Sequence, residues 1–261
     1  MNQQNKHSEF AAQIRAAYAG TPIAPIRTQL AELDVDAAYA IQQENTAHWQ
    51  AEGRGLVGSK IGLTSRAVQN QLGVDRPDFG VLFADMMVAE DEPVAAGRVL
   101  QPKIEAEVAF LLDRDVDVEA PTVIDVLRAV AYAMPALEIV GSRITNWDIG
   151  VVDTVADNAS SGLFVLGGPI RRLDGLNLRA LQMQMTRREE IVSKGTGAAC
   201  LGNPLNAMAW LASELAGRKR PLRAGDVVLS GALGPWCRSI RVTRSKRTSR
   251  VWGRCPPGSR S

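Results

Sequence analysis

The first fifty residues have the apolar spacing of helices. Apolar positions recur at helical intervals over residues 10–18 and again over about residues 34–49, with a Thr-Pro break at residues 21–22 between them. Two glycines follow the second stretch and close it. We therefore expect two helices, which form a helical N-terminal segment over residues 1–55 that packs on the main domain.

After residue 55 the pattern changes to short β-rich runs separated by glycine and proline. These runs include "LVGSKIGL", "KIEAEVAFLL" and "SGLFVLGG". Two more helices are predicted, over residues 122–133 and 204–217, and the second has an N-cap at Asn203, proline at its first position and glycine at its end. With no internal repeat, the mixture predicts an α+β fold for one domain over residues 56–235.

A single glutamate, Glu138, interrupts the apolar run "AYAMPALEIVG" at residues 131–141. The run has strand character, and its apolar neighbours leave Glu138 no solvated face. Burial of an unpaired carboxylate costs several kcal/mol or more. We therefore expect a partner that holds Glu138.

The segment "KIEAEVAF" adds two carboxylates on one strand. Glu105 and Glu107 alternate with apolar residues, so the period of two puts them on the same face, roughly 7 Å apart. Taken alone, this segment fits a half-buried strand with a solvated acidic face. Together with Glu138, it predicts three inward-facing carboxylates and a hard divalent cation between them, Mg²⁺ or Mn²⁺ before zinc.

Histidine and cysteine supply no comparable site. His7 and His48 both lie in the helical N-terminal segment and are expected at the surface, so proton transfer falls to carboxylate, lysine or metal-bound water. The three cysteines are too few and too irregularly spaced for a disulfide framework or a zinc site and are expected to be reduced, with Cys200 structural. The segment "GTGAACLG" follows no buried strand and does not predict a nucleotide site.

Composition restricts the class of protein. An apolar content of 46% over 261 residues predicts a globular protein with a substantial core. The sequence has no run of about 18 apolar residues, and its polar N-terminus does not resemble a signal peptide, so we expect a cytoplasmic protein without membrane association.

Two charged residues occur in unusual settings. Lys60 lies inside the glycine-flanked run "GSKIGLTS", and Asp78 follows proline in "RPDFG". Each has an ordinary explanation when considered alone: Lys60 as an exposed strand residue and Asp78 as a turn former.

Several long stretches together resemble one known family. They are "KIGLTSRAVQNQLGVDRPDFGVLFADM", "QPKIEAEVAFLL", "PALEIVGSRITNWDIGVVDTVADNASSG", "CLGNPLNAMAWLA" and "LRAGDVVLSGALGP". The family is the 2-keto-4-pentenoate hydratases (2-hydroxypenta-2,4-dienoate hydratases) of the fumarylacetoacetate hydrolase superfamily. The resemblance covers about nine-tenths of the chain and implies a mixed β-sheet roll.

The resemblance also implies roles for individual residues. The family's metal ligands match Glu105, Glu107 and Glu138, which agrees with the burial argument. Lys60 and Asp78 match the proton-handling groups of the site. Ser160 in "DNASS" is a weaker candidate for a substrate contact. Arg143 either meets a substrate carboxylate or forms a structural salt bridge.

The implied activity is metal-dependent hydration of 2-hydroxypenta-2,4-dienoate to 4-hydroxy-2-oxopentanoate, late in the meta-cleavage degradation of aromatic compounds. A 4-oxalocrotonate-type decarboxylase, which removes CO₂ from a 2-oxo acid, is the alternative. The expected partners are the small-molecule dienoate, further copies of the chain in a homo-oligomer, and enzymes neighbouring in the pathway.

The resemblance stops after Pro235, where a basic tail begins. Residues 236–261 hold eight basic and no acidic residues, whereas the preceding residues carry 22 basic against 28 acidic. One reading is an extension that binds nucleic acid or another polyanion. The other is a shifted reading frame: codons that encode "WCR" also permit Met-Val-Pro one base away, and the same displacement continues into Val-Asn-Pro-Gly-Asp and Gly-Leu-Gly-Ser-Val. This agreement favours the frame shift, and with it no nucleic-acid partner.

Overall fold

The computed structural model describes residues 3–30, 34–66, 69–70 and 74–238. The tail predicted to be frame-shifted lies outside the described residues from 239 onward. None of the described helices combines the length and apolarity needed to cross a bilayer.

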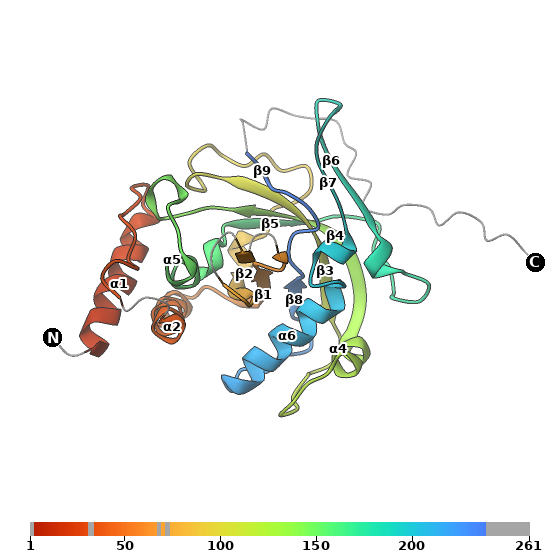
Figure 1. The fold of residues 1–261 in the computed structure, drawn as a ribbon, viewed down its shortest axis with the longest axis horizontal. Helices are drawn as coiled ribbons and strands as arrows, with labels where there is room; N and C mark the ends of the chain where they lie inside the picture. The colour runs from red at the N-terminus through yellow and green to blue at the C-terminus, as the bar shows by residue number, and fades with distance from the viewer. Residues whose placement is uncertain (1–2, 31–33, 67–68, 71–73, 239–261) are drawn as a thin grey trace, which may run out of the picture.

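A curled mixed sheet forms the centre of the molecule (Figure 1). The pairing of β1 with β8 is parallel, and the other named pairings in this sheet are antiparallel. In spatial order the strands are β2 (Asp78–Phe83), β1 (Leu56–Gly62), β8 (Val227–Leu229), β3 (Lys103–Leu112), β4 (Val130–Val140) and β5 (Leu163–Leu166), and β9 (Cys237–Arg238) also pairs with β3. This arrangement confirms the α+β fold expected from the sequence.

Helices and a separate hairpin surround this sheet. The helices α1 and α2 lie together at one end, and the hairpin β6–β7 projects from the other (Figure 1). The element bounds are α1 (Gln3–Ala17), α2 (Val35–Ala51), α4 (Val123–Ala129), α5 (Val151–Ala156), α6 (Pro204–Gly217), β6 (Gln182–Arg187) and β7 (Glu190–Thr196). Helix α6 has the predicted bounds, and the side chain of Asn203 accepts a hydrogen bond from the backbone N–H of Leu205 as its N-cap.

The helix predicted over residues 122–133 is wrong in its second half. Helix α4 ends at Ala129, and the chain passes directly into β4 at Val130. The apolar run continues across this boundary, so periodicity cannot locate it. Pairing of β4 with β3 from Val130 onward decides the conformation there.

The two faces of β3 differ in chemistry, and this difference positions the site. Ala106, Val108 and Phe110 belong to the larger apolar core, which helix α6 also joins. On the opposite face, Ala109 packs in a second apolar cluster that includes Met134 and Ala136 of β4. Because side chains alternate along a strand, Glu105 and Glu107 lie on this second face, beyond its apolar cluster.

Candidate active site

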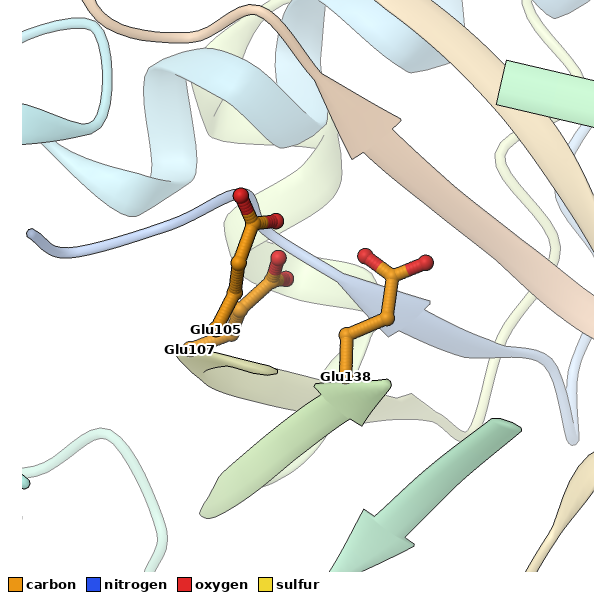
Figure 2. Close-up of side chains that lie close together, drawn as sticks. All are labelled: Glu105, Glu107 and Glu138. Atoms are coloured by element: carbon orange, nitrogen blue, oxygen red, sulfur yellow. The ribbon is translucent and has the colours of Figure 1, made fainter. Parts of the chain in front are cut away.

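Three glutamates from two neighbouring strands meet on one face of the sheet. Glu105 of β3 lies directly opposite Glu138 of β4, and Glu107 follows two residues later. Figure 2 shows the three side chains extending toward a common space, and one carboxylate oxygen from each lies within 4.8 Å of the others. The structure therefore brings together the three carboxylates that the sequence singled out.

Burial makes this cluster electrostatically costly. Glu107 and Glu138 are 0% and 1% exposed, and Glu105 is half-buried. Among the described residues, Oε1 of Glu107 and both carboxylate oxygens of Glu138 lack a hydrogen-bond partner. Burial raises the pKa of Glu105, raises that of Glu107 well above its ordinary value, and raises that of Glu138 to about 7.

Lys60 of β1 brings a positive charge to this cluster. Its Nζ lies 3.3 Å from Oε1 of Glu138 as an ion pair, although the two atoms do not reach hydrogen-bond geometry, and only 3% of Lys60 is exposed. The alternative of an exposed strand residue is therefore wrong. Burial alone would lower the pKa of Lys60, but the surrounding carboxylates, led by Glu138, raise it above its ordinary value. Lys60 stays protonated.

The donor set fits a hard divalent cation. When the three glutamates are ionised, Lys60 balances one negative charge, and the remaining two match one divalent ion. Carboxylate oxygens are the ligands that Mg²⁺ and Mn²⁺ prefer in proteins. The buried oxygens without donors are the atoms that such an ion would contact.

Asp78 lies at the first position of β2, opposite Gly62 of β1. It is 2% exposed, so the structure contradicts the alternative of a simple turn former. Its Oδ2 accepts a hydrogen bond from Thr154 at 3.4 Å. A Cβ on Gly62 would lie 2.2 Å from Oδ1, so only glycine leaves room for this carboxylate. Burial raises the pKa of Asp78, and Lys60, Thr154 and the adjoining backbone partly oppose that rise.

Ser160 approaches the same region from a short 3₁₀ turn (Asn158–Ser160). It is 5% exposed, and its hydroxyl lies 3.2 Å from that of Thr154. Sequence reasoning missed Thr154. The only signal for it was its place in the polar-rich segment "DTVADNASSG", where hydroxyls, carboxylates and one amide interrupt an apolar stretch.

Arg143 forms an internal ion pair. Its Nε lies 2.5 Å from Oδ1 of Asp157, its backbone N–H donates to Oδ2, and its guanidinium lies 4.4 Å from the ring centre of Tyr18. Only 2% of Arg143 is exposed. This geometry favours the structural salt bridge over a substrate contact.

The remaining candidates take no part in the site. His7 is 9% exposed, so the expected surface position is wrong: it shares one face of α1 with Phe10, Ala11 and Ile14, which pack in the core. His48 is exposed and lies 3.2 Å from Glu52. Cys200 is buried, and its thiol donates to the backbone oxygen of Ser230, as expected for a structural cysteine.

The backbone of Gly231 fixes one of the glutamates. Its N–H donates to Oε2 of Glu107 at 2.8 Å, and its φ of +103° lies in the region that favours glycine. A Cβ at this position would lie 2.5 Å from the side chain of Thr64. Sequence reasoning missed this contact as well.

Replacement of Gly231 with alanine is expected to weaken divalent-metal affinity about 10- to 100-fold, because displacement of the backbone misaligns Glu107. The free energy of unfolding should fall by about 1–3 kcal/mol. Isothermal titration with Mn²⁺ and thermal unfolding measure the two effects. Gly225→Ala is the matched control, since Gly225 has a φ of +91° but open space around its Cβ position. Equal metal affinity in both variants would contradict the role of Gly231.

The curled sheet with its carboxylate cluster is matched by known proteins. Residues 43–251 match the family described as Fumarylacetoacetate (FAA) hydrolase C-terminal. A solved structure of 4-oxalocrotonate decarboxylase from Pseudomonas putida G7, complexed with magnesium and adipate, has a TM-score of 0.87 and 32% identity, covering 91% of this chain and 90% of that one. The chain belongs to the fumarylacetoacetate hydrolase superfamily.

Relatives of higher identity place the chain within a family of that superfamily. It is 62% identical over 226 residues to 2-keto-4-pentenoate hydratase 2 of Dechloromonas aromatica, and the matched region covers 86% of each of the two chains. It is 57% identical over 220 residues to the TodF product hydratase of Pseudomonas putida, covering 84% of this chain and 82% of that relative. Its family is therefore that of the 2-keto-4-pentenoate hydratases.

Proposed function

We propose that this chain is a hydro-lyase that adds water to 2-hydroxypenta-2,4-dienoate, the enol of 2-keto-4-pentenoate, and yields 4-hydroxy-2-oxopentanoate in the meta-cleavage degradation of aromatic compounds. The observation that carries the proposal is the cluster of Glu105, Glu107 and Glu138 beside Lys60, with buried oxygens that have no donor. Identities of 52–62% to proteins named as 2-keto-4-pentenoate hydratases support the reaction.

The three glutamates would hold a divalent cation, Mg²⁺ or Mn²⁺. When bound, such an ion supplies a Lewis acid for the carboxylate and C2 oxygen of the substrate. Lys60, whose Nζ lies 3.3 Å from Oε1 of Glu138, offsets one negative charge of the metal-free cluster and is proposed, with Asp78, to handle protons. Ser160 offers a hydroxyl to the substrate, whereas the guanidinium of Arg143 is already paired with Asp157.

Asp78 is the proposed proton carrier. In the first step the C2 hydroxyl loses its proton and C5 gains one, which gives a conjugated 2-oxo-3-enoate. In the second step water adds across C3 and C4, with the hydroxyl on C4 and the proton on C3. Because burial raises the pKa of Asp78, its carboxyl can hold a proton nearer to neutral pH than an exposed aspartate can.

Ultraviolet absorbance of the dienol tests the proposal. The chain is expected to consume the dienol with Mg²⁺ or Mn²⁺ and to lose activity at least about 100-fold with a chelator. Analysis of the products distinguishes the alternative activity, because only a 4-oxalocrotonate-type decarboxylase releases CO₂. Release of CO₂ from 4-oxalocrotonate without hydration of the dienol would overturn the hydratase assignment.

We also propose that the basic tail, residues 236–261, results from a shifted reading frame and carries no evolved function. The family match extends to residue 251, so the boundary after Pro235 stays a prediction. In the described part, Nζ of Lys103 lies 3.8 Å from the ring centre of the exposed Trp236, and β9 adds only two residues beside β3. A chain with the frame restored should hydrate the dienol at least as fast and unfold at a higher temperature. An unambiguous in-frame read of the source DNA through codon 236 would contradict the frame shift.

Several further expectations stay predictions within this proposal. They are a cytoplasmic location, a homo-oligomeric assembly, association with neighbouring pathway enzymes and the identity of the physiological ion. Light scattering of the purified chain measures the assembly directly.

A further inference from the structure

Three buried side chains, those of Asp78, Thr154 and Ser160, form a hydrogen-bonded series that connects the carboxylate of Asp78 with the hydroxyl of Ser160. The hydroxyl of Thr154 on α5 donates to Oδ2 of Asp78 at 3.4 Å and lies 3.2 Å from the hydroxyl of Ser160. The three residues are 2% (Asp78), 4% (Thr154) and 5% (Ser160) exposed. Both oxygen–oxygen distances are longer than the usual length of an O–H···O hydrogen bond. Hydrogen bonds in an active site are often long without substrate and shorten when substrate binds.

The number of protons on these groups determines which group donates and which accepts in each of the two hydrogen bonds. A threonine hydroxyl has one proton to donate and two acceptor lone pairs. When that proton is used on Oδ2 of Asp78, the link between Thr154 and Ser160 requires Ser160 to donate. The two lone pairs of the Ser160 hydroxyl then remain as acceptors for an O–H group of the substrate or of water.

The same hydrogen bond makes the two oxygens of Asp78 unequal. Oδ2 is occupied by Thr154, whereas Oδ1 lacks a hydrogen-bond partner of normal geometry among the described residues. Oδ1 lies over Gly62, where a Cβ would be 2.2 Å away from it and 3.6 Å from Nζ of Lys60. Oδ1 therefore lies on the Lys60 side and is the oxygen free to exchange a proton.

The backbone that carries Ser160 is held in a strained form. Asn158, Ala159 and Ser160 have φ values of 53°, 50° and 57°, a run of left-handed residues that each cost about 1–2 kcal/mol. The side chain of Asn158 bonds both backbone groups of Val81, at 2.8 and 3.0 Å. The preceding Asp157 is fixed by Arg143. Strain retained in this way holds the Ser160 hydroxyl against Thr154.

We infer that Thr154 is a positioning residue that selects Oδ1 of Asp78 as the proton-exchanging oxygen and holds Ser160 as a hydrogen-bond acceptor toward the substrate. The inference rests on the proposed hydratase function and deepens it. Thr154 itself touches no reacting atom. Its effect belongs to the chemical step, so it should alter kcat more than KM.

Two substitutions separate the hydroxyl of Thr154 from its methyl group. Thr154→Val keeps the shape and removes the hydroxyl, whereas Thr154→Ser keeps the hydroxyl and removes the methyl. Both are made in the full chain and in the frame-restored chain. We expect Thr154→Val to lower kcat for the dienol about 10- to 100-fold, with KM within about threefold. Thr154→Ser should keep kcat within about threefold of the parent.

The Mn²⁺-induced rise in unfolding temperature is measured on the same proteins and should be unchanged in both variants. A valine variant that keeps kcat within threefold, or a serine variant that falls as far as the valine one, would overturn the inference. A variant that loses both kcat and the Mn²⁺-induced rise in unfolding temperature would also overturn the inference, because that result would show that Thr154 acts through the packing of the site.

A second readout distinguishes failure of this inference from failure of the hydratase proposal. Exchange of the C3 protons of 2-oxopentanoate in D₂O, followed by NMR, requires proton transfer but no chemistry at C4. A parent that exchanges these protons without hydrating the dienol contradicts the hydratase proposal, and slower exchange in Thr154→Val alone still supports the inference. A parent that does neither contradicts both, since Asp78 would then transfer no proton.

Discussion

Replacement of Glu107 with glutamine is expected to abolish metal-dependent activity and, at the same time, to stabilise the metal-free protein. Loss of one charged ligand removes several kcal/mol of the stabilisation that a bound metal ion gives the transition state, so kcat/KM should fall about 10²- to 10⁴-fold. The amide oxygen of glutamine can still accept the hydrogen bond from Gly231. The fold around Glu107 is therefore expected to persist.

The stabilising effect follows from the sign of the pKa shifts. The pKa values of Glu107 and Glu138 are higher in the folded chain than in the unfolded one, so metal-free stability falls as pH rises through the folded values, about 7 for Glu138. Glutamine cannot ionise, so the variant avoids the cost of placing a further negative charge in this buried cluster as pH rises. We expect the free energy of unfolding of the metal-free variant to exceed that of the parent by about 1–2 kcal/mol, which raises the unfolding temperature by roughly 3–6 °C.

Calorimetric unfolding at pH 8, with and without Mn²⁺, measures both effects of this substitution. Glu190→Gln on the exposed hairpin strand β7 is the matched control, since the side chain of Glu190 is 75% exposed. It should change neither the metal response nor the activity. A Glu107→Gln variant that is less stable than the parent in the absence of metal would contradict the electrostatic account of the cluster.

Replacement of Asp78 with asparagine should lower kcat about 10²- to 10⁴-fold while Mn²⁺ affinity stays within about threefold. The amide fits the space against Gly62 and can still accept the hydrogen bond from Thr154, but it cannot carry the transferred proton. Steady-state kinetics with the dienol and titration with Mn²⁺ provide the two measurements.

The control for this substitution lies three residues earlier in the sequence. Asp75→Asn removes a carboxylate that is 81% exposed and should leave kcat unchanged. If Asp78→Asn keeps kcat within threefold of the parent, proton transfer belongs to another group and the mechanism is wrong. If both activity and Mn²⁺ binding are lost together, Asp78 supports the metal site instead.

The buried state of Glu138 could be predicted because every near neighbour in its strand is apolar. The shared face of Glu105 and Glu107 could be predicted because the period of a strand is two. The register that sets Glu105 opposite Glu138 could not be derived from these local patterns. It depends on how far β4 slides along β3, and only resemblance to a known family linked the two segments beforehand.

Other parts of the site could not be read from local sequence. Thr154 resembles an ordinary helical threonine until α5 is placed beside β2, and the bond from Gly231 to Glu107 joins residues far apart in sequence. The choice between a substrate contact and a salt bridge for Arg143 depended on the position of Asp157. His7 was misassigned because its polarity outweighed its place on the apolar face of α1.

A crystal of the chain soaked in Mn²⁺, with diffraction recorded at the manganese absorption edge, locates the cation without reference to activity. We expect one anomalous peak per chain, with an oxygen of Glu105, Glu107 and Glu138 each about 2.0–2.4 Å away. A peak elsewhere, or no peak with the ion pair between Lys60 and Glu138 unchanged, would contradict the three-glutamate metal site on which the proposed hydration depends.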